Sequence, residues 1–230
     1  MTAKRVYQFP DGKSLTLGER TLVMGILNVT PDSFSDGGRW NTRERALRHM
    51  EEMVQDGADI VDVGAESSRP GFVPMSAAEE MERLMPLLEA VLLECPVPVS
   101  VDTFKAETAR AALAAGTHIL NDIWGLQYAE EPGEMARAAA EANAPVVVMH
   151  NQNGTEYDRD IIAAMREFFT VSMEIADAAG LSRENIILDP GIGFGKTPAA
   201  NMHVMRCMDE LISYDGAHYP LLLGASRKSF

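Results

Sequence analysis

The stretch MGILNVTPDSFSDGG, residues 24–38, decides which fold the rest of the chain is expected to have. Its first residues belong to a short apolar strand, predicted over residues 22–27, which runs into Asn28. A polar loop with two adjacent glycines follows. In α/β proteins the loops after strand ends carry the functional side chains. We therefore expect a binding or catalytic site here, with further site residues after each later strand.

The composition suits one large α/β domain over residues 1–230 and restricts the classes of partner. The chain has 230 residues, of which 46% are hydrophobic, enough to fill a full core. Its 20 Lys and Arg residues against 34 Asp and Glu residues give a net charge of −14. This acidic balance argues against a nucleic-acid partner and against binding to anionic membranes. An anionic substrate would need a local cluster of basic residues.

Cysteine usage and the N-terminal sequence favour a cytoplasmic protein. Cys95 and Cys207 lie far apart in the sequence, and nothing requires a disulfide between them. The N-terminus lacks the apolar core of a signal peptide, and no run reaches the roughly 18 apolar residues of a membrane span. We expect a cytoplasmic location and no membrane partner.

Short apolar runs alternate with amphipathic helices along the chain, after an N-terminal hairpin that pairs residues 6–9 with 15–17. Pro86 predicts a kink or a break in one of the helices. The expected strands are 22–27, 60–64, 97–101, 118–120, 145–149, 186–188 and 220–223, and the expected helices are 42–57, 77–93, 106–115, 133–142, 161–179 and 200–212.

This alternation predicts a (β/α)8 TIM-type barrel with a short N-terminal β-hairpin, and a doubly wound open sheet is the alternative. Polar residues follow almost every strand, which suits loops that converge on one mouth. No G-x-G-x-x-G motif follows the first strand. The chain ends at Phe230 after about seven β/α units, so we expect a barrel that is incomplete at its C-terminal end.

The residues at the predicted strand ends are rich in Asp and Asn and poor in nucleophiles. Because the carboxyl ends of parallel strands face one side of a barrel, these residues are expected to share one site, built to bind rather than to attack. They are Asn28, Asp62, Glu66 to Arg69, Asp102, Thr103, Asn121, Asp122, His150, Asn151, Asp189 and Ser226 to Ser229.

The acceptors in this set suggest what is bound. Buried carboxylates are costly unless they are paired, and a heterocycle with amino and ring N–H groups would pair them. Asp102, Asn121 and Asp189 suit the edge of a pterin or a purine. The alternative is that each of them caps the following helix or closes a turn. His150 is a weaker candidate that follows a strand and is expected to face the mouth.

The donors lie in two other loops. Arg69 follows Ser67 and Ser68, and Arg227 and Lys228 lie between Ser226 and Ser229; both loops offer cations and hydroxyls to phosphate or carboxylate groups. Residues 189–196 add a glycine-rich turn ending in a lysine, without the spacing of a Walker motif. We expect those glycines mainly to allow a tight turn.

Taken together, these motifs resemble the dihydropteroate synthase family over almost the whole chain. Each motif is moderately specific, and all six in this order are highly specific. They are Leu27-Asn-Val-Thr-Pro-Asp-Ser-Phe-Ser-Asp-Gly-Gly38, Glu66-Ser-Ser-Arg-Pro-Gly71, Val101-Asp-Thr103, Asn121-Asp122, Asp189 to Lys196, and Gly224-Ala-Ser-Arg-Lys-Ser229.

The resemblance implies a homodimeric barrel enzyme that joins 6-hydroxymethyl-7,8-dihydropterin diphosphate to 4-aminobenzoate in folate synthesis. It implies catalytic roles for Asp102, Lys228 and Arg69, with Arg69 at the diphosphate, and Mg2+ held by Asn28. The implied pterin residues are Asp102, Asn121, Asp189 and Lys228. The implied residues of the 4-aminobenzoate site, where sulfonamides compete, are Ser68, Pro70, Phe34 and Ser229. Arg227 is also implied to bind a substrate.

Two departures from the family pattern matter. Ser68 stands where the family commonly has Thr, which keeps the hydroxyl. The family's last strand carries an Arg-x-His that helps bind diphosphate, and the sequence ends before it, so weak or no activity is expected of this chain. A methyltetrahydrofolate-binding methyltransferase module and a non-catalytic pterin-binding paralogue or fragment are the competing functions.

Overall fold

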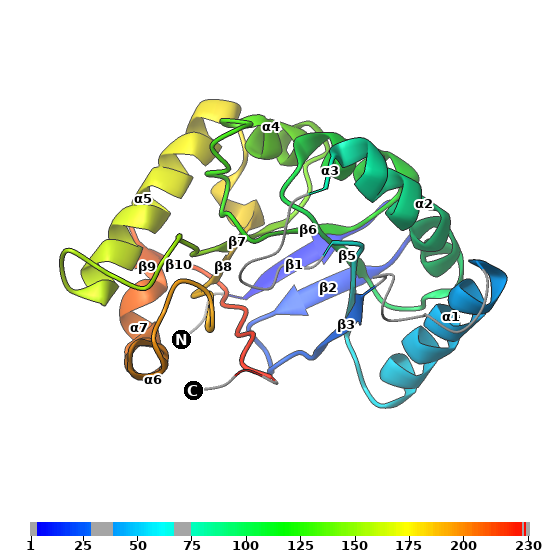
Figure 1. The fold of residues 1–230 in the computed structure, drawn as a ribbon, viewed down its shortest axis with the longest axis horizontal. Coiled ribbons are helices and arrows are strands. Elements are labelled where there is room, and N and C mark those ends of the chain that lie inside the picture. Colours follow the sequence, from blue (N-terminus) through cyan, green and yellow to red (C-terminus); the bar gives the residue numbers. More distant parts are fainter. Residues whose placement is uncertain (1–3, 29–38, 67–74, 227, 229–230) are drawn as a thin grey trace. The chain divides into compact units, whose positions relative to one another are not determined.

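The computed structural model describes residues 4–28, 39–66, 75–226 and 228 (Figure 1). The chain divides into two compact units, Lys4–Asn121 and Asp122–Phe230. None of the helices in the described ranges has the length and apolar character needed to cross a membrane.

The first unit opens with the expected hairpin. Strands β1 (Arg5–Gln8) and β2 (Ser14–Leu17) pair in antiparallel fashion, and Gly12 in the turn has a φ of 89°, which glycine adopts without strain. Asp11 in the same turn accepts a hydrogen bond from Nε2 of His118 at 3.0 Å. On its other side the His118 ring accepts the backbone N–H of Val99 at Nδ1, at 2.9 Å. His118 therefore ties the hairpin to the parallel strands.

Four parallel strands follow in the order β3-β4-β5-β6, alternating with helices that pack beside one another in sequence order (Figure 1). Strand β4 is buried along its whole length, as expected of a parallel strand covered on both faces. The elements are β3 (Met24–Asn28), α1 (Arg39–Gln55), β4 (Ile60–Gly64), α2 (Ala77–Glu94), β5 (Val99–Asp102), α3 (Ala106–Ala115) and β6 (Ile119–Asp122).

Local sequence explains where these helices begin and end. Ser76 and Glu79 form a reciprocal capping box at the start of α2, and Gly116 ends α3 in the left-handed conformation. The break considered at Pro86 is wrong, because α2 runs through it. Pro86 lies on the exposed side of the helix, so water can hydrate the carbonyl that loses its hydrogen bond.

The core of this unit lies between the strands and the inner faces of α1 and α2. These side chains are apolar and nearly all fully buried, so they supply the main stabilisation of the unit. They include Leu27, Met50, Val61, Val63, Leu84, Leu88, Val91, Val99 and Val101.

The second unit continues the alternation with a parallel pair, β7 beside β8, and with the long helix α5, which packs against α4, α6 and α7. A parallel bridge from Leu188 to Leu221 extends the pairing, where a strand over 220–223 was expected. The elements are α4 (Glu134–Glu141), β7 (Val146–Met149), α5 (Ile161–Ala179), the short 3-10 helix η2 (Arg183–Asn185), β8 (Ile186–Asp189), α6 (Pro198–Arg206) and α7 (Met208–Leu211).

The sequence prediction missed two features near the end of this unit. The expected helix over 200–212 is interrupted at Cys207, which separates α6 from α7. A small hairpin of β9 (Ser213–Tyr214) and β10 (Ala217–His218) then follows. Asp215 and Gly216 have φ values of 50° and 76°, as a two-residue hairpin turn with Asp-Gly requires. Six parallel strands alternating with helices nevertheless confirm the predicted α/β class.

Replacing His118 is expected to weaken the first unit. His118→Ala leaves the buried Val99 N–H without its acceptor and should lower the free energy of unfolding by about 2 kcal/mol. His118→Asn places an amide oxygen near the position of Nδ1 and should recover at least about half of that loss. Urea unfolding of both variants checks this, and equal losses for Ala and Asn would contradict the assigned role of Nδ1.

Candidate functional site

Four residues at the carboxyl ends of neighbouring strands lie in one row of the first unit. Asn28 is opposite Gly64, Gly64 is opposite Asp102, and Asp102 is opposite Asn121. Residues in register on parallel strands project to the same face of a sheet. The side chains of Asn28, Asp102 and Asn121 therefore share one face, and none of the three is fully buried. The structure brings these three predicted site residues together.

Gly64 in the middle of this row keeps its neighbours close. A Cβ at this position would lie 3.4 Å from Oδ1 of Asn28, 3.3 Å from Cβ of Asp102 and 3.5 Å from Oδ2 of Asp102. An amide oxygen and a carboxylate oxygen thus border the space that a side chain here would occupy. A Cβ here would be tight against Asp102 and in ordinary contact with Asn28, so glycine leaves room between these side chains, although its φ is not unusual.

Asp62 lies two residues before Gly64, so its side chain points to the same face. Its Oδ2 accepts a hydrogen bond from Nδ2 of Asn121 at 3.0 Å. Burial raises the pKa of Asp62, while contacts with Ser100 and Asn121 act in the opposite direction. Because Asn121 donates to Asp62, its amide is fixed with Oδ1 as the remaining acceptor. Asp62 therefore positions the amide of Asn121. In the sequence it stands out as a carboxylate inside the apolar run 60–64.

In the second unit, Asp189 closes the turn that follows β8. Its Oδ1 accepts the backbone N–H of Gly191 at 2.7 Å. Burial raises the pKa of Asp189 to about 6, against the influence of that N–H and of Lys228 and Lys196. The turn-closing alternative therefore holds for one oxygen of this carboxylate. The carboxylate nevertheless belongs to a cluster with two cations.

Lys228 lies against the same glycine-rich turn. Its ammonium donates to the carbonyl of Ile192 and lies 4.5 Å from the centroid of the Phe194 ring. A Cβ at Gly193 would meet Cδ of Lys228 at 2.8 Å, so glycine is needed for this approach. Burial lowers the pKa of Lys228, and Asp189 opposes that shift. Two predicted pterin residues, Asp189 and Lys228, are thus placed at one turn.

Lys196 fixes this turn, a role that was not predicted from the sequence. Its Nζ lies 3.0 Å from the carbonyl of Gly191, 2.9 Å from the carbonyl of Phe194 and 2.9 Å from Nδ1 of His150. Burial lowers its pKa to about 7, while Asp189 acts in the opposite direction. A lysine after a glycine-rich run suggests a phosphate ligand, but this one binds backbone carbonyls. These carbonyls belong to the same turn, five and two residues before the lysine, whereas His150 lies 46 residues away.

His150 and Asp122 have structural roles. His150 was expected to face the mouth, but it is 2% exposed, and burial together with Lys196 lowers its pKa to about 3. Asp122 accepts the backbone N–H groups of Trp124 at 2.8 Å and Leu126 at 2.6 Å, which closes the turn after β6. Burial raises the pKa of Asp122 to about 7. For Asp122 the turn-closing alternative is correct.

Seven predicted site residues lie outside the described residues. They are Phe34, Ser67, Ser68, Arg69, Pro70, Arg227 and Ser229. Among the residues that the structure describes, no three His, Cys, Asp or Glu side chains form a group that could hold a metal ion.

Short polar side chains at the ends of parallel strands, with a cationic turn after β8, define the class. This is an α/β protein that binds a small polar molecule at the carboxyl ends of its strands.

The comparisons with known proteins agree with that class and narrow it. A family model described as "Pterin binding enzyme" matches residues 24–230. The dihydropteroate synthase of Bacillus subtilis is 49% identical over 217 residues, which cover 94% of this chain and 74% of that protein.

Solved structures give the same result. The dihydropteroate synthase of Xanthomonas albilineans with 4-aminobenzoic acid is 38% identical, with a TM-score of 0.86 over 99% of this chain and 80% of that chain. The enzyme of Burkholderia cenocepacia complexed with 7,8-dihydropteroate is 36% identical, with a TM-score of 0.83 over 99% and 79%. The chain therefore belongs to the dihydropteroate synthase family of pterin-binding enzymes. Likeness to these TIM-type barrels confirms the predicted fold.

The lowered pKa of Lys196 predicts a pH dependence of stability. The unfolded chain holds this proton up to the ordinary value of 10.5, whereas the folded chain releases it at about 7. The unfolded state therefore binds more protons between these values, and the free energy of unfolding rises with pH in this window.

Lys196→Met removes this contribution. The stability difference between wild type and Lys196→Met should shift in favour of wild type by about 1 kcal/mol per pH unit from pH 7 to 9. Urea unfolding at several pH values measures the difference, with Lys4→Met at an exposed ion pair as the control. A difference that stays constant over this range would show that Lys196 keeps its ordinary pKa.

Proposed function

We propose that the chain condenses 6-hydroxymethyl-7,8-dihydropterin diphosphate with 4-aminobenzoate to give 7,8-dihydropteroate and diphosphate. The observation that carries this proposal is the row of Asn28, Gly64, Asp102 and Asn121 at the carboxyl ends of four paired strands. It combines with family membership and with relatives whose structures hold 4-aminobenzoic acid and 7,8-dihydropteroate.

The pterin is proposed to bind through its N–H groups. Asp102 and Asp189 offer carboxylate acceptors, and Asn121, oriented by Asp62, offers both an acceptor and a donor. Lys228 is proposed to donate to a pterin acceptor from the turn after β8. Such pairing offsets the desolvation of the carboxylates, which is the reason that a ligand rich in N–H groups suits them.

The reaction breaks the bond between the pterin methylene carbon and the diphosphate oxygen, and that oxygen keeps the electron pair. The amine of 4-aminobenzoate then forms a C–N bond to the same carbon and loses a proton. Positive charge develops on the pterin methylene as diphosphate departs, and the Asp102 carboxylate would stabilise it. Arg69 would neutralise charge on the departing diphosphate. This chemistry needs no protein nucleophile.

Mg2+ fits the donors present in the first unit. Oδ1 of Asn28 and Oδ2 of Asp102 are hard oxygen ligands on either side of the space at Gly64. Mg2+ is commonly bound by one or two protein oxygens, with substrate phosphates and water as the other ligands. We propose that Asn28 holds it. When bound, it would supply positive charge that makes diphosphate a better leaving group.

The enzyme is proposed to be a homodimer and to be located in the cytoplasm. The two free thiols, Cys95 and Cys207, suit a reducing compartment. Sedimentation of the purified chain would measure the oligomeric state.

Asp102→Ala is expected to lower kcat/KM for dihydropteroate formation by about a hundredfold, because it removes charge stabilisation of the transition state. Diphosphate release and 7,8-dihydropteroate formation are measured together, with and without 4-aminobenzoate. Asp177→Ala, which removes an exposed partner of Arg183, is the control. A methyltransferase module would release no diphosphate, and a non-catalytic binder would bind pterin without turnover.

Asn28→Ala is expected to weaken the response to Mg2+. The concentration of Mg2+ at half-maximal activity should rise at least about tenfold, since a direct oxygen ligand is lost. Chelation by EDTA should stop turnover in the wild type, and added Mg2+ should restore it. Asn153→Ala, at an exposed loop position, is the matched control. An unchanged Mg2+ dependence in Asn28→Ala would remove this residue from the metal site.

A further inference from the structure

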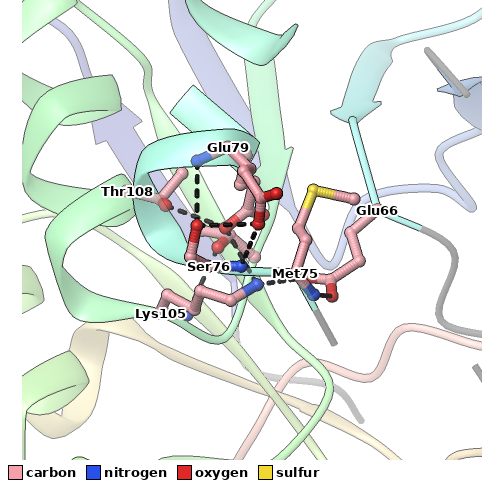
Figure 2. A network of polar contacts seen from close by, with 8 residues as sticks. Glu66, Met75, Ser76, Glu79, Lys105 and Thr108 are labelled. Atoms are coloured by element: carbon pink, nitrogen blue, oxygen red, sulfur yellow. Dashed lines mark hydrogen bonds and ion pairs between the residues drawn. The ribbon is translucent and has the colours of Figure 1, made fainter. Parts of the chain in front are cut away.

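A network of charged side chains is buried in the first unit beside the strand ends (Figure 2). The ammonium of Lys105 contacts Oε2 of Glu66 and lies 3.2 Å from Oε2 of Glu80. Thr108 donates its hydroxyl to the same oxygen of Glu80 at 2.8 Å. The exposed fractions of the Lys105, Glu66 and Glu80 side chains are 6%, 6% and 1%. Lys105, Glu80 and Thr108 were not expected at the site, whereas Glu66 was among the residues expected at the strand ends.

Glu66 makes a second contact that links two distant points of the chain. Its Oε1 accepts the backbone N–H of Met75, nine residues later, at 2.8 Å. The two oxygens of one carboxylate thus hold a backbone N–H and a buried ammonium (Figure 2). The next residue, Ser76, begins the capping box of α2, so the backbone is held at two consecutive residues, Met75 and Ser76.

The segment between these two points is residues 67–74, which in sequence contains Ser68, Arg69 and Pro70. Glu66, the residue before this segment, therefore binds Met75, the residue after it. Fixing both ends of a segment reduces the conformations open to it, which lowers the entropy lost when its side chains bind a ligand.

Lys105 connects this junction to the strand that carries Asp102. It lies three residues after Asp102, at the N-terminus of α3, and its backbone N–H donates to Oγ1 of Thr103. The Thr103 N–H in turn donates to the carbonyl of Asn121 at 3.1 Å. Because the ion pair of Lys105 and Glu66 is buried, loss of either charge is costly, and its geometry is therefore strictly held.

We propose that Glu66 is a positioning residue, which through Met75 and Lys105 fixes the ends of segment 67–74 relative to the strand that carries Asp102. This inference rests on the proposed function for the roles of Ser68 and Arg69. It does not require Glu66 to touch a substrate.

The test compares Glu66→Ala with Glu80→Ala, since each variant removes one carboxylate partner of Lys105 and leaves it the other. Only Glu66→Ala removes the acceptor of the Met75 N–H. Amide hydrogen exchange at Met75 should be at least about tenfold faster in Glu66→Ala and change less than about twofold in Glu80→Ala. The buried amide of Val101 reports whether a variant has lost global stability instead.

Kinetics provide the second readout. Glu66→Ala should raise KM for 4-aminobenzoate and lower kcat, each by about tenfold, because the two residues that flank positions 67–74 are no longer joined. Binding of the pterin, measured by its fluorescence, should change less than about twofold. Glu80→Ala should keep the wild-type kinetic constants. This split would not result from a merely structural role, which would reduce the active fraction without changing KM.

Two results would overturn the proposal. One is a Met75 amide in Glu66→Ala that exchanges as slowly as in the wild type, and the other is an equal effect of both variants on exchange and on KM. If the wild-type chain forms no 7,8-dihydropteroate, the proposed function fails instead. The exchange experiment then still decides whether Glu66 anchors the segment.

Discussion

The pairing register of the parallel strands is the constraint on which the site depends. It places Asn28, Gly64, Asp102 and Asn121 in one row, so that three polar side chains share a face and Gly64 leaves room between two of them. A slip of one residue would bring Leu27 or Val101 into that row and turn the polar set to the opposite face. Such a slip would also turn the buried side chains of β4 and β5 to the opposite covered face, where the close packing of the core is not matched to them.

Buried charges around the strand ends support this arrangement, and each has a different kind of partner. Asp62 accepts from an amide, Lys196 donates to backbone carbonyls, and Lys105 lies between two carboxylates. Desolvation makes each of these groups costly if it loses its partner. They therefore hold specific conformations rather than add net stability. In both units, groups that do not need to touch a ligand fix the backbone of those that are proposed to touch it.

Periodicity and turn residues predicted the β1–β2 hairpin, the parallel strands and the polar strand ends, because these signals are local. The interruption at Cys207 and the β9–β10 hairpin have weaker local signals, although Asp215-Gly216 is a recognisable turn. The roles of Lys105 and Lys196 could not be predicted. Glu66 lies 39 residues from Lys105 and His150 lies 46 residues from Lys196, so neither contact has a local signal. The carbonyls of Gly191 and Phe194 are close to Lys196 in the sequence, but every residue has a backbone carbonyl, so the sequence does not indicate which ones a lysine will bind.

The proposed reaction depends strongly on contacts that hold the site residues in place. Without a protein nucleophile, the rate must come from positioning and from charge, so an error in placement costs rate directly. Asp and Asn on strands have few rotamers and are placed by the backbone alone. Lys228 is long and would lose more conformational freedom, but the carbonyl of Ile192 and the ring of Phe194 already hold it. The turn after β8 therefore gives a flexible cation the placement that the strands give to Asp102, and Lys196 keeps that turn in position.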